Sequence, residues 1–227
     1  MDTRSSLASS FPLRPRSQGS PHSENQSVGW PFFMVHSRQQ QPSALLARSW
    51  RLPEIGLVRV IRPSPADIAH IDETWPARRR LTDWHHSWRW HEITASRPEA
   101  FALRKDDGSL LGIWCSAKKA PITLPDGRFY RPDFLEISPD ARGREVGAFI
   151  FLLIASRALE LKAEGIVLGT WPVLREFYSR MGGHERKPRG WNLENNLVPF
   201  VFDLATLQGL KNLLDGMEHH GEGTPNL

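Results

Sequence analysis

Cysteine, tyrosine and long apolar runs are scarce in this chain of 227 residues. Its single cysteine, Cys115, excludes a disulfide framework and a cysteine-based zinc site, and this scarcity fits a reducing compartment. No segment approaches the roughly 20 consecutive apolar residues that a membrane span needs. The longest, at 146–155, contains Gly147 and is followed by Ser156 and Arg157. We therefore expect a cytoplasmic protein that does not enter a membrane.

Positive charge is concentrated at one end of the chain. Residues 1–52 contain six arginines and two acidic residues, and this surplus accounts for the whole net charge of +4. The rest of the chain is therefore balanced and offers no broad field for binding phosphates. Nucleic acid is not favoured as a partner, although a nucleic-acid binder that uses its basic tail remains an alternative.

The same segment, residues 1–52, is rich in Ser, Pro, Gln and Arg and has neither a helical nor a strand period. It is predicted to be disordered because it cannot bury enough apolar surface to offset its chain entropy. Two interpretations of this segment stay open: it is an address signal, or the start of the sequence is mispredicted and the protein begins at Met34. We expect one folded domain at 53–215 and a flexible C-terminus at 216–227.

Hydrophobic periodicity predicts an alternation of helices and strands in the folded part. Ser64 and Pro65 have the residue types of a helix N-cap and first helical position, and Asp107-Gly108 suits a tight hairpin turn. The expected strands are 57–62, 99–105, 110–119, 129–137, 165–171 and 197–204, and the expected helices are 65–74, 84–93, 146–164, 172–181 and 205–215.

The most informative string is the loop that joins the strand ending at Ile137 to the following helix. A strand-to-helix loop directs successive backbone N–H groups and the positive end of the helix dipole to one point, which suits a pyrophosphate. Gly143 and Gly147 allow the backbone to approach a ligand closely, while Arg142 and Arg144 add positive charge. A purely structural loop of similar composition remains the alternative.

Two separated motifs resemble the GNAT superfamily of N-acyltransferases. The first is Ile137-Ser138-Pro139 followed by Arg142-Gly143-Arg144-Glu145-Val146-Gly147, and the second is Phe177-Tyr178 with Gly182-Gly183. The resemblance implies an α/β fold, layered as α+β, with a mixed, mostly antiparallel central sheet and helices on both faces. It also implies direct transfer of an acyl group from acetyl-CoA to a small-molecule or protein amine, without a metal or a covalent enzyme intermediate.

The resemblance assigns roles to particular residues. Tyr178 matches the position that protonates the leaving thiolate, although a tyrosine that only packs remains the alternative. A backbone N–H within 134–137 would stabilise the oxyanion. Asp133 and Glu136 are both candidates for the base, on opposite faces of their strand, and His184 is a weaker one. The residues expected to bind the cofactor are Ile137, Ser138, Arg142, Gly143, Arg144, Glu145, Val146 and Gly147.

Three positions depart from the family pattern. Glu145 replaces the first glycine of the loop, Trp171 an asparagine at the start of the next helix, and Gly183 a phenylalanine. A carboxylate beside a pyrophosphate should weaken binding unless it points outward or serves the helix dipole. The alternative function is therefore a GNAT-fold module that has lost turnover and binds a ligand or a partner protein.

The segment 74–93 is unusually rich in Trp, Arg and His. In the family the corresponding segment covers the acceptor, and aromatic rings beside guanidinium groups suit an aromatic or anionic acceptor, or a cation held over a ring. Simple packing is the alternative, since Trp84 and Trp88 are one helical turn apart. The spacing of His85 and His91 does not predict a metal site, and a homodimer stays open.

Overall fold

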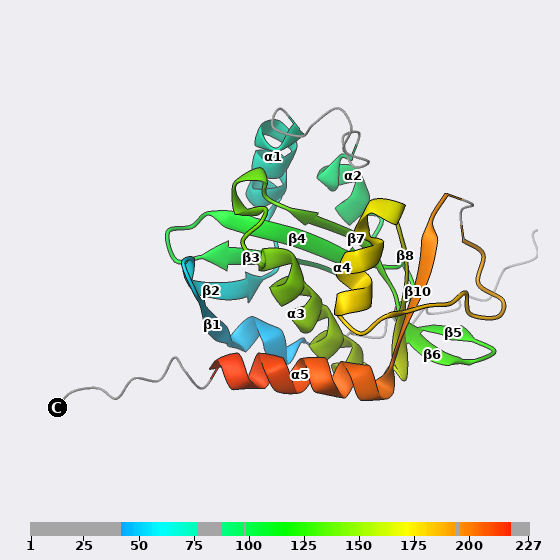
Figure 1. Ribbon diagram of the computed structural model, residues 1–227. Coiled ribbons are helices and arrows are strands. Elements are labelled where there is room, and N and C mark those ends of the chain that lie inside the picture. Colours follow the sequence, from blue (N-terminus) through cyan, green and yellow to red (C-terminus); the bar gives the residue numbers. More distant parts are fainter. Residues whose placement is uncertain (1–41, 77–87, 98, 194–195, 219–227) are drawn as a thin grey trace, which may run out of the picture. The chain divides into compact units, whose positions relative to one another are not determined.

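The structure is a computed structural model that describes residues 42–76, 88–97, 99–193 and 196–218 (Figure 1). These residues belong to one unit of the chain, 41–227. Its elements are η1 Ala44–Ala47, β1 Ser49–Leu52, β2 Gly56–Ile61, α1 Pro65–Thr74, α2 Trp90–Ala95, β3 Ala100–Lys105, β4 Leu110–Ser116, β5 Ile122–Leu124, β6 Gly127–Tyr130, β7 Pro132–Ile137, η3 Pro139–Ala141, α3 Val146–Glu160, β8 Gly165–Thr170, η4 Pro172–Leu174, α4 Arg175–Arg180, β9 His184–Glu185, β10 Val198–Asp203 and α5 Leu204–Glu218.

Two five-stranded sheets form the centre of this unit. The first has the order β1-β2-β3-β4-β7 and is antiparallel throughout, and the second has the order β5-β6-β8-β10-β9 with a parallel β6–β8 pair. α1 and α2 pack on one face of the first sheet, whereas α3 and α5 belong to the main core on the other face (Figure 1). The expected mixed, mostly antiparallel sheet with helices on both faces is thus confirmed.

The segment expected to form one strand at 129–137 is divided between the two sheets. Its first part, in β6, pairs in parallel with β8 at Tyr130↔Ile166, and its second part, β7, pairs with β4. The division falls at Arg131-Pro132, where a proline has no N–H to continue a ladder. Because β6 pairs with β8 whereas β7 pairs with β4, β7 and β8 are not paired with each other.

The domain begins earlier than the expected boundary at residue 53. η1 and β1 lie within 42–52, and β1 pairs with β2 over its whole length. Leu45 is fully buried and Trp50 is 1% exposed, so this segment contributes to the main core. The prediction failed here because four residues are too short to establish a strand period. α5 also continues to Glu218, while residues 1–41 and 219–227 lie outside the described residues.

Several local predictions are confirmed, and one helix start is not. α1 has the expected N-cap at Ser64, whose own backbone N–H donates in return to the Asp67 carboxylate, and the hairpin β3–β4 turns at Gly108 with φ +89°. α2 begins only at Trp90, and Asp72 accepts hydrogen bonds from the first backbone N–H groups of this helix. The hairpin β5–β6 was not predicted as a separate unit, because the expected strand 129–137 joined the end of β6 to β7. No helix in the described ranges has the length and apolar character needed to span a bilayer.

Candidate functional site

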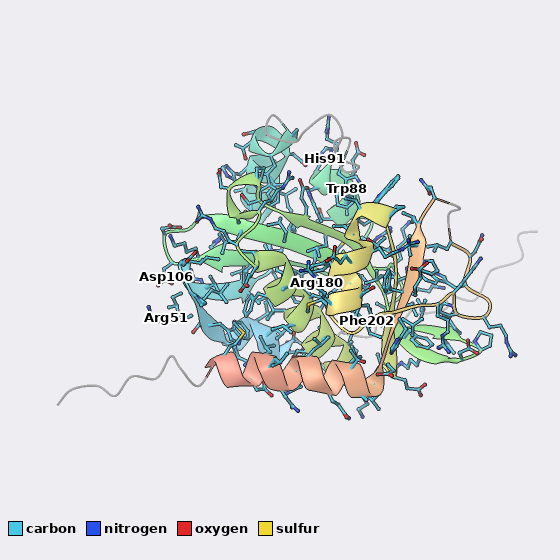
Figure 2. The ribbon with its side chains drawn as sticks, in the orientation of Figure 1. Arg51, Trp88, His91, Asp106, Arg180 and Phe202 are labelled. Atoms are coloured by element: carbon cyan, nitrogen blue, oxygen red, sulfur yellow. The ribbon has the colours of Figure 1, made fainter. Side chains whose placement is uncertain are left out.

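A cavity of about 1000 Å³ lies where β7 and β8 part from each other. Its walls come from β7, the end of β8, the first turn of α3, α4 and the loop before β10. Figure 2 shows two of its lining residues, Trp88 just before α2 and Arg180 on α4. The division of one chain segment between two sheets therefore creates the cavity.

The expected anion-binding loop forms one end of this cavity. Ile137, Arg142, Gly143, Glu145, Val146 and Gly147 line it, whereas Ser138 and Arg144 do not. The Ser138 N–H donates to the Leu111 carbonyl at 2.9 Å, so this residue anchors the loop to β4. A Cβ atom at Gly147 would lie 3.9 Å from Ile137 and 4.0 Å from Phe177. Both distances are ordinary van der Waals contacts, so the backbone at Gly147 forms part of the cavity wall and a larger side chain at this position would extend into the cavity.

Glu145 occupies a backbone conformation that favours glycine. It has φ +60° and ψ +3°, is exposed, and precedes α3 without a side-chain hydrogen bond that caps the helix. A non-glycine residue in this left-handed region costs about 1–2 kcal/mol. The family pattern has glycine at this position, and the geometry explains why. Glu145 is therefore a strained residue in a turn that favours glycine, and it lines the cavity.

Tyr178 lines the cavity from α4 and is 7% exposed. Its ring packs against Phe151 and Phe177, with centroids at 5.5 and 4.9 Å, and also contacts Phe200 and Phe202. None of the residues that the structure describes forms a hydrogen bond with its hydroxyl. Burial raises the pKa of Tyr178 well above its ordinary value, so the hydroxyl keeps its proton at neutral pH. Tyr178 is therefore a protonated residue in the wall of the cavity.

Glu136 is a buried carboxylate on β7 that also lines the cavity. The indole N–H of Trp90, at the start of α2, donates to its Oε2 at 2.7 Å. Burial of a carboxylate is costly unless it is hydrogen-bonded, and this contact meets part of that requirement. Trp90 is itself fully buried, so the direction of the Glu136 side chain is fixed by the packing of α2 on the sheet.

Asp133 is the extra residue of a β-bulge. Ser116 pairs with Pro132 and Cys115 with Phe134, so Asp133 has no partner position on β4. A bulge interrupts strict alternation, and the expectation that Asp133 and Glu136 serve opposite faces is wrong. Asp133 contacts Arg97, just after α2, and Glu136 contacts α2 itself. Both carboxylates line the cavity.

The remaining departures from the family pattern have structural explanations. Trp171 follows β8 and lines the cavity. A Cβ atom at Gly183 would lie 2.5 Å from Phe202 and 2.9 Å from Phe200, which leaves no space for a phenylalanine. His184 is exposed on β9 and is absent from the cavity wall.

The Trp-rich segment divides between packing and the cavity. Trp75 and Trp90 are buried in the cluster under α1 and α2, whereas Trp88 lines the cavity. Trp84, His85 and the three arginines at 78–80 lie outside the described residues.

Within the described ranges, no group of three His, Cys, Asp or Glu side chains is arranged to hold a metal ion. Trp191 and Leu193 also line the cavity, which the sequence did not indicate because neither residue belongs to a recognisable motif.

Comparison with solved structures identifies the architecture. An acetyltransferase of the GNAT family from Listeria monocytogenes covers 69% of this chain and 100% of its own, with a TM-score of 0.51 at 15% identity. A spermidine N-acetyltransferase chimera of Vibrio cholerae and hSSAT covers 66% and 98%, with a TM-score of 0.50 at 10% identity. No protein-family model and no curated protein matches the sequence. The chain therefore has the GNAT N-acyltransferase fold, as its motifs indicated.

Proposed function

We propose that this protein transfers an acyl group from acyl-CoA to an amine. One observation carries the proposal: a single cavity connects the N-terminal end of α3 with a buried tyrosine and a buried glutamate. The helix end suits the pyrophosphate of the donor, and the two side chains suit the proton transfers of amine acylation. The fold is consistent with this activity.

Glu136 is the better candidate for the base. Both oxygens of Asp133 are engaged by guanidinium groups, Oδ2 by Arg97 at 3.0 Å and Oδ1 by Arg131 at 2.6 Å. Glu136 accepts a hydrogen bond from the neutral indole of Trp90, which orients its carboxylate. Glu136 takes the proton of the acceptor ammonium, directly or through a water molecule, and the neutral amine attacks the thioester carbon.

The other two requirements of the reaction fall to β7 and Tyr178. β7 is the edge strand of the first sheet in the described part of the chain, so some of its N–H groups lie outside the ladder and suit the developing oxyanion. The tetrahedral intermediate then collapses: the C–S bond breaks, the hydroxyl of Tyr178 donates its proton to the departing sulfur, and the proton that the acylated nitrogen loses is transferred back to Tyr178 through water. The raised pKa ensures that the proton is present, although it also makes complete transfer less favourable than a strong hydrogen bond.

A binding module without turnover is the second candidate function. The observation in its favour is Glu145, which places a carboxylate and a strained backbone at the expected anion site. The two functions differ in one measurable respect. Both predict binding of CoA, but only the transferase releases a free thiol when an amine is added.

Thermal stabilisation by acetyl-CoA tests the proposal. A ligand at 100 times its dissociation constant adds about 2.7 kcal/mol of stability. Gly147→Trp should abolish the stabilisation because its side chain would fill the cavity, and Gly209→Trp is the matched control on the exposed face of α5. If millimolar acetyl-CoA does not stabilise the parent protein, both candidate functions are wrong. Stabilisation without thiol release across a broad set of amines supports the binding module.

A further inference from the structure

The cavity end that lies away from α3 contains the aromatic side chains of Trp88 and Phe134. β7 runs toward the anion-binding loop, so its first residues, Pro132 to Phe134, lie at the opposite end. Trp88 packs edge-on against Phe134 with ring centroids 4.9 Å apart, and Trp191 lines the same cavity. Aromatic walls of this kind bind flat, apolar groups.

The same end of the cavity also carries positive charge. Arg97 and Arg131 both line it, and both pair with the single carboxylate of Asp133. Each ion pair uses one nitrogen of a guanidinium group that has five N–H donors. The Arg97 guanidinium also lies over the Phe134 ring, 5.4 Å from its centroid. Two guanidinium groups around one carboxylate leave a surplus positive charge beside the aromatic wall.

The position of Glu136 sets the spacing between the two charged parts of the site. Glu136 follows Asp133 by three positions along β7, which spans at most about 10 Å. If Glu136 accepts the proton of the amine, the surplus positive charge near Asp133 lies several ångströms from the reacting nitrogen. A polyamine would place its second positive charge against Arg97 and Arg131, which is unfavourable.

On the basis of the proposed function, we propose that the acceptor is an aromatic primary amine whose ring carries an anionic group on the side away from the amine. The ring lies against Trp88 and Phe134. The amine faces Glu136, and the anionic group pairs with Arg97 and Arg131.

Two matched pairs of amines test the substrate class. para-Aminomethylbenzoate and benzylamine differ only in the carboxylate, while para-aminomethylbenzoate and γ-aminobutyrate differ in the ring. Thiol release from acetyl-CoA gives kcat/KM for each, with spermidine as the polycationic comparison. Because a charge-assisted hydrogen bond is stronger than a neutral one, we expect kcat/KM for para-aminomethylbenzoate to exceed that for benzylamine by about tenfold or more. Loss of the ring should cost at least about tenfold as well.

Substitutions assign these preferences to the named side chains. Arg131→Gln should bring the ratio between para-aminomethylbenzoate and benzylamine from about tenfold close to one. Arg128→Gln, an exposed arginine on β6 outside the cavity, is the matched control and should keep the ratio. Trp88→Ala should raise KM for both aromatic amines while leaving the stabilisation by acetyl-CoA in place.

The outcomes separate this inference from the proposed function. Equal kcat/KM for the two amines of either pair, a preference for spermidine, or an unchanged ratio in Arg131→Gln overturns the aromatic, anionic acceptor while the transferase stands. Stabilisation by acetyl-CoA without thiol release from any of the four amines overturns the acceptor class as well. If acetyl-CoA does not bind at all, the proposed function itself fails.

Discussion

The two tyrosines of this chain occupy opposite kinds of buried environment. Tyr130 is fully buried, and its hydroxyl donates to Glu99 Oε2 at 3.1 Å. Arg157 donates to the other oxygen of Glu99 at 2.9 Å through Nε and to Glu160 at 2.7 Å. Tyr178 lies among phenylalanine rings and faces a cavity, and no described residue bonds its hydroxyl. Both tyrosines have a raised pKa, from burial in each case and additionally from the charge of Glu99 beside Tyr130.

The comparison teaches that burial alone does not identify a functional tyrosine. A hydroxyl that is already part of a closed network with Glu99 and Arg157 contributes to stability and has no role for a ligand. A hydroxyl held in a fixed direction at a cavity, without a protein partner, can donate to a ligand atom. The following predictions test whether these two environments separate stability from turnover.

The largest expected effect is on stability at the buried charge network. Arg157→Met should lower the free energy of unfolding by about 3–5 kcal/mol, because the buried Glu99 loses its main hydrogen-bond and ion-pair partner. Urea denaturation measures the change. Arg175→Met is the control, since it removes an ion pair with Glu185 whose side chains are 57% and 46% exposed. This surface pair should contribute less than about 1 kcal/mol, and equal losses in both variants would contradict the prediction.

The second prediction compares the tyrosines directly. Tyr178→Phe keeps the ring and its packing but deletes the proton, so kcat should fall by about 100-fold with little change in stability. Tyr130→Phe should do the reverse, with the free energy of unfolding lowered by about 1–3 kcal/mol and kcat unchanged. Turnover is measured with an amine that releases thiol from acetyl-CoA. If Tyr178→Phe turns over at the parent rate, water protonates the leaving group and Tyr178 is a packing residue.

The smallest expected effect concerns the strained residue at the cavity. Glu145→Gly should stabilise the protein by about 1 kcal/mol because glycine adopts a positive φ without steric cost. It should also tighten acetyl-CoA binding by about 1 kcal/mol through the removal of a nearby negative charge. Lys162→Gly is the matched control, since Lys162 has φ +56° but lies at the far end of α3. Thermal unfolding with and without acetyl-CoA separates the two effects, and weaker binding in Glu145→Gly would assign that carboxylate a useful role.

Much of the site was predictable because it follows local rules. A strand that turns into a helix must direct N–H groups to one point, so the anion-binding loop around Gly147 could be read from residues adjacent in sequence. The tyrosine in α4 could be read from its spacing to Gly182, which ends that helix with φ +86°. The proposed choice between Asp133 and Glu136 could not be read, because it depends on a bulge in β7 and on Arg97 from another segment.

The sequence by itself determined the order of the longer helices and strands, the capped start of α1 and the turn at Gly108, since each depends on contacts between residues close along the chain. Only the tertiary structure decided three further features. It placed Trp50 in the core, divided one strand between two sheets, and brought Trp88 and Trp191 to the cavity wall. These features arise from packing between distant segments, and a local period carries no information about which distant partner a side chain meets.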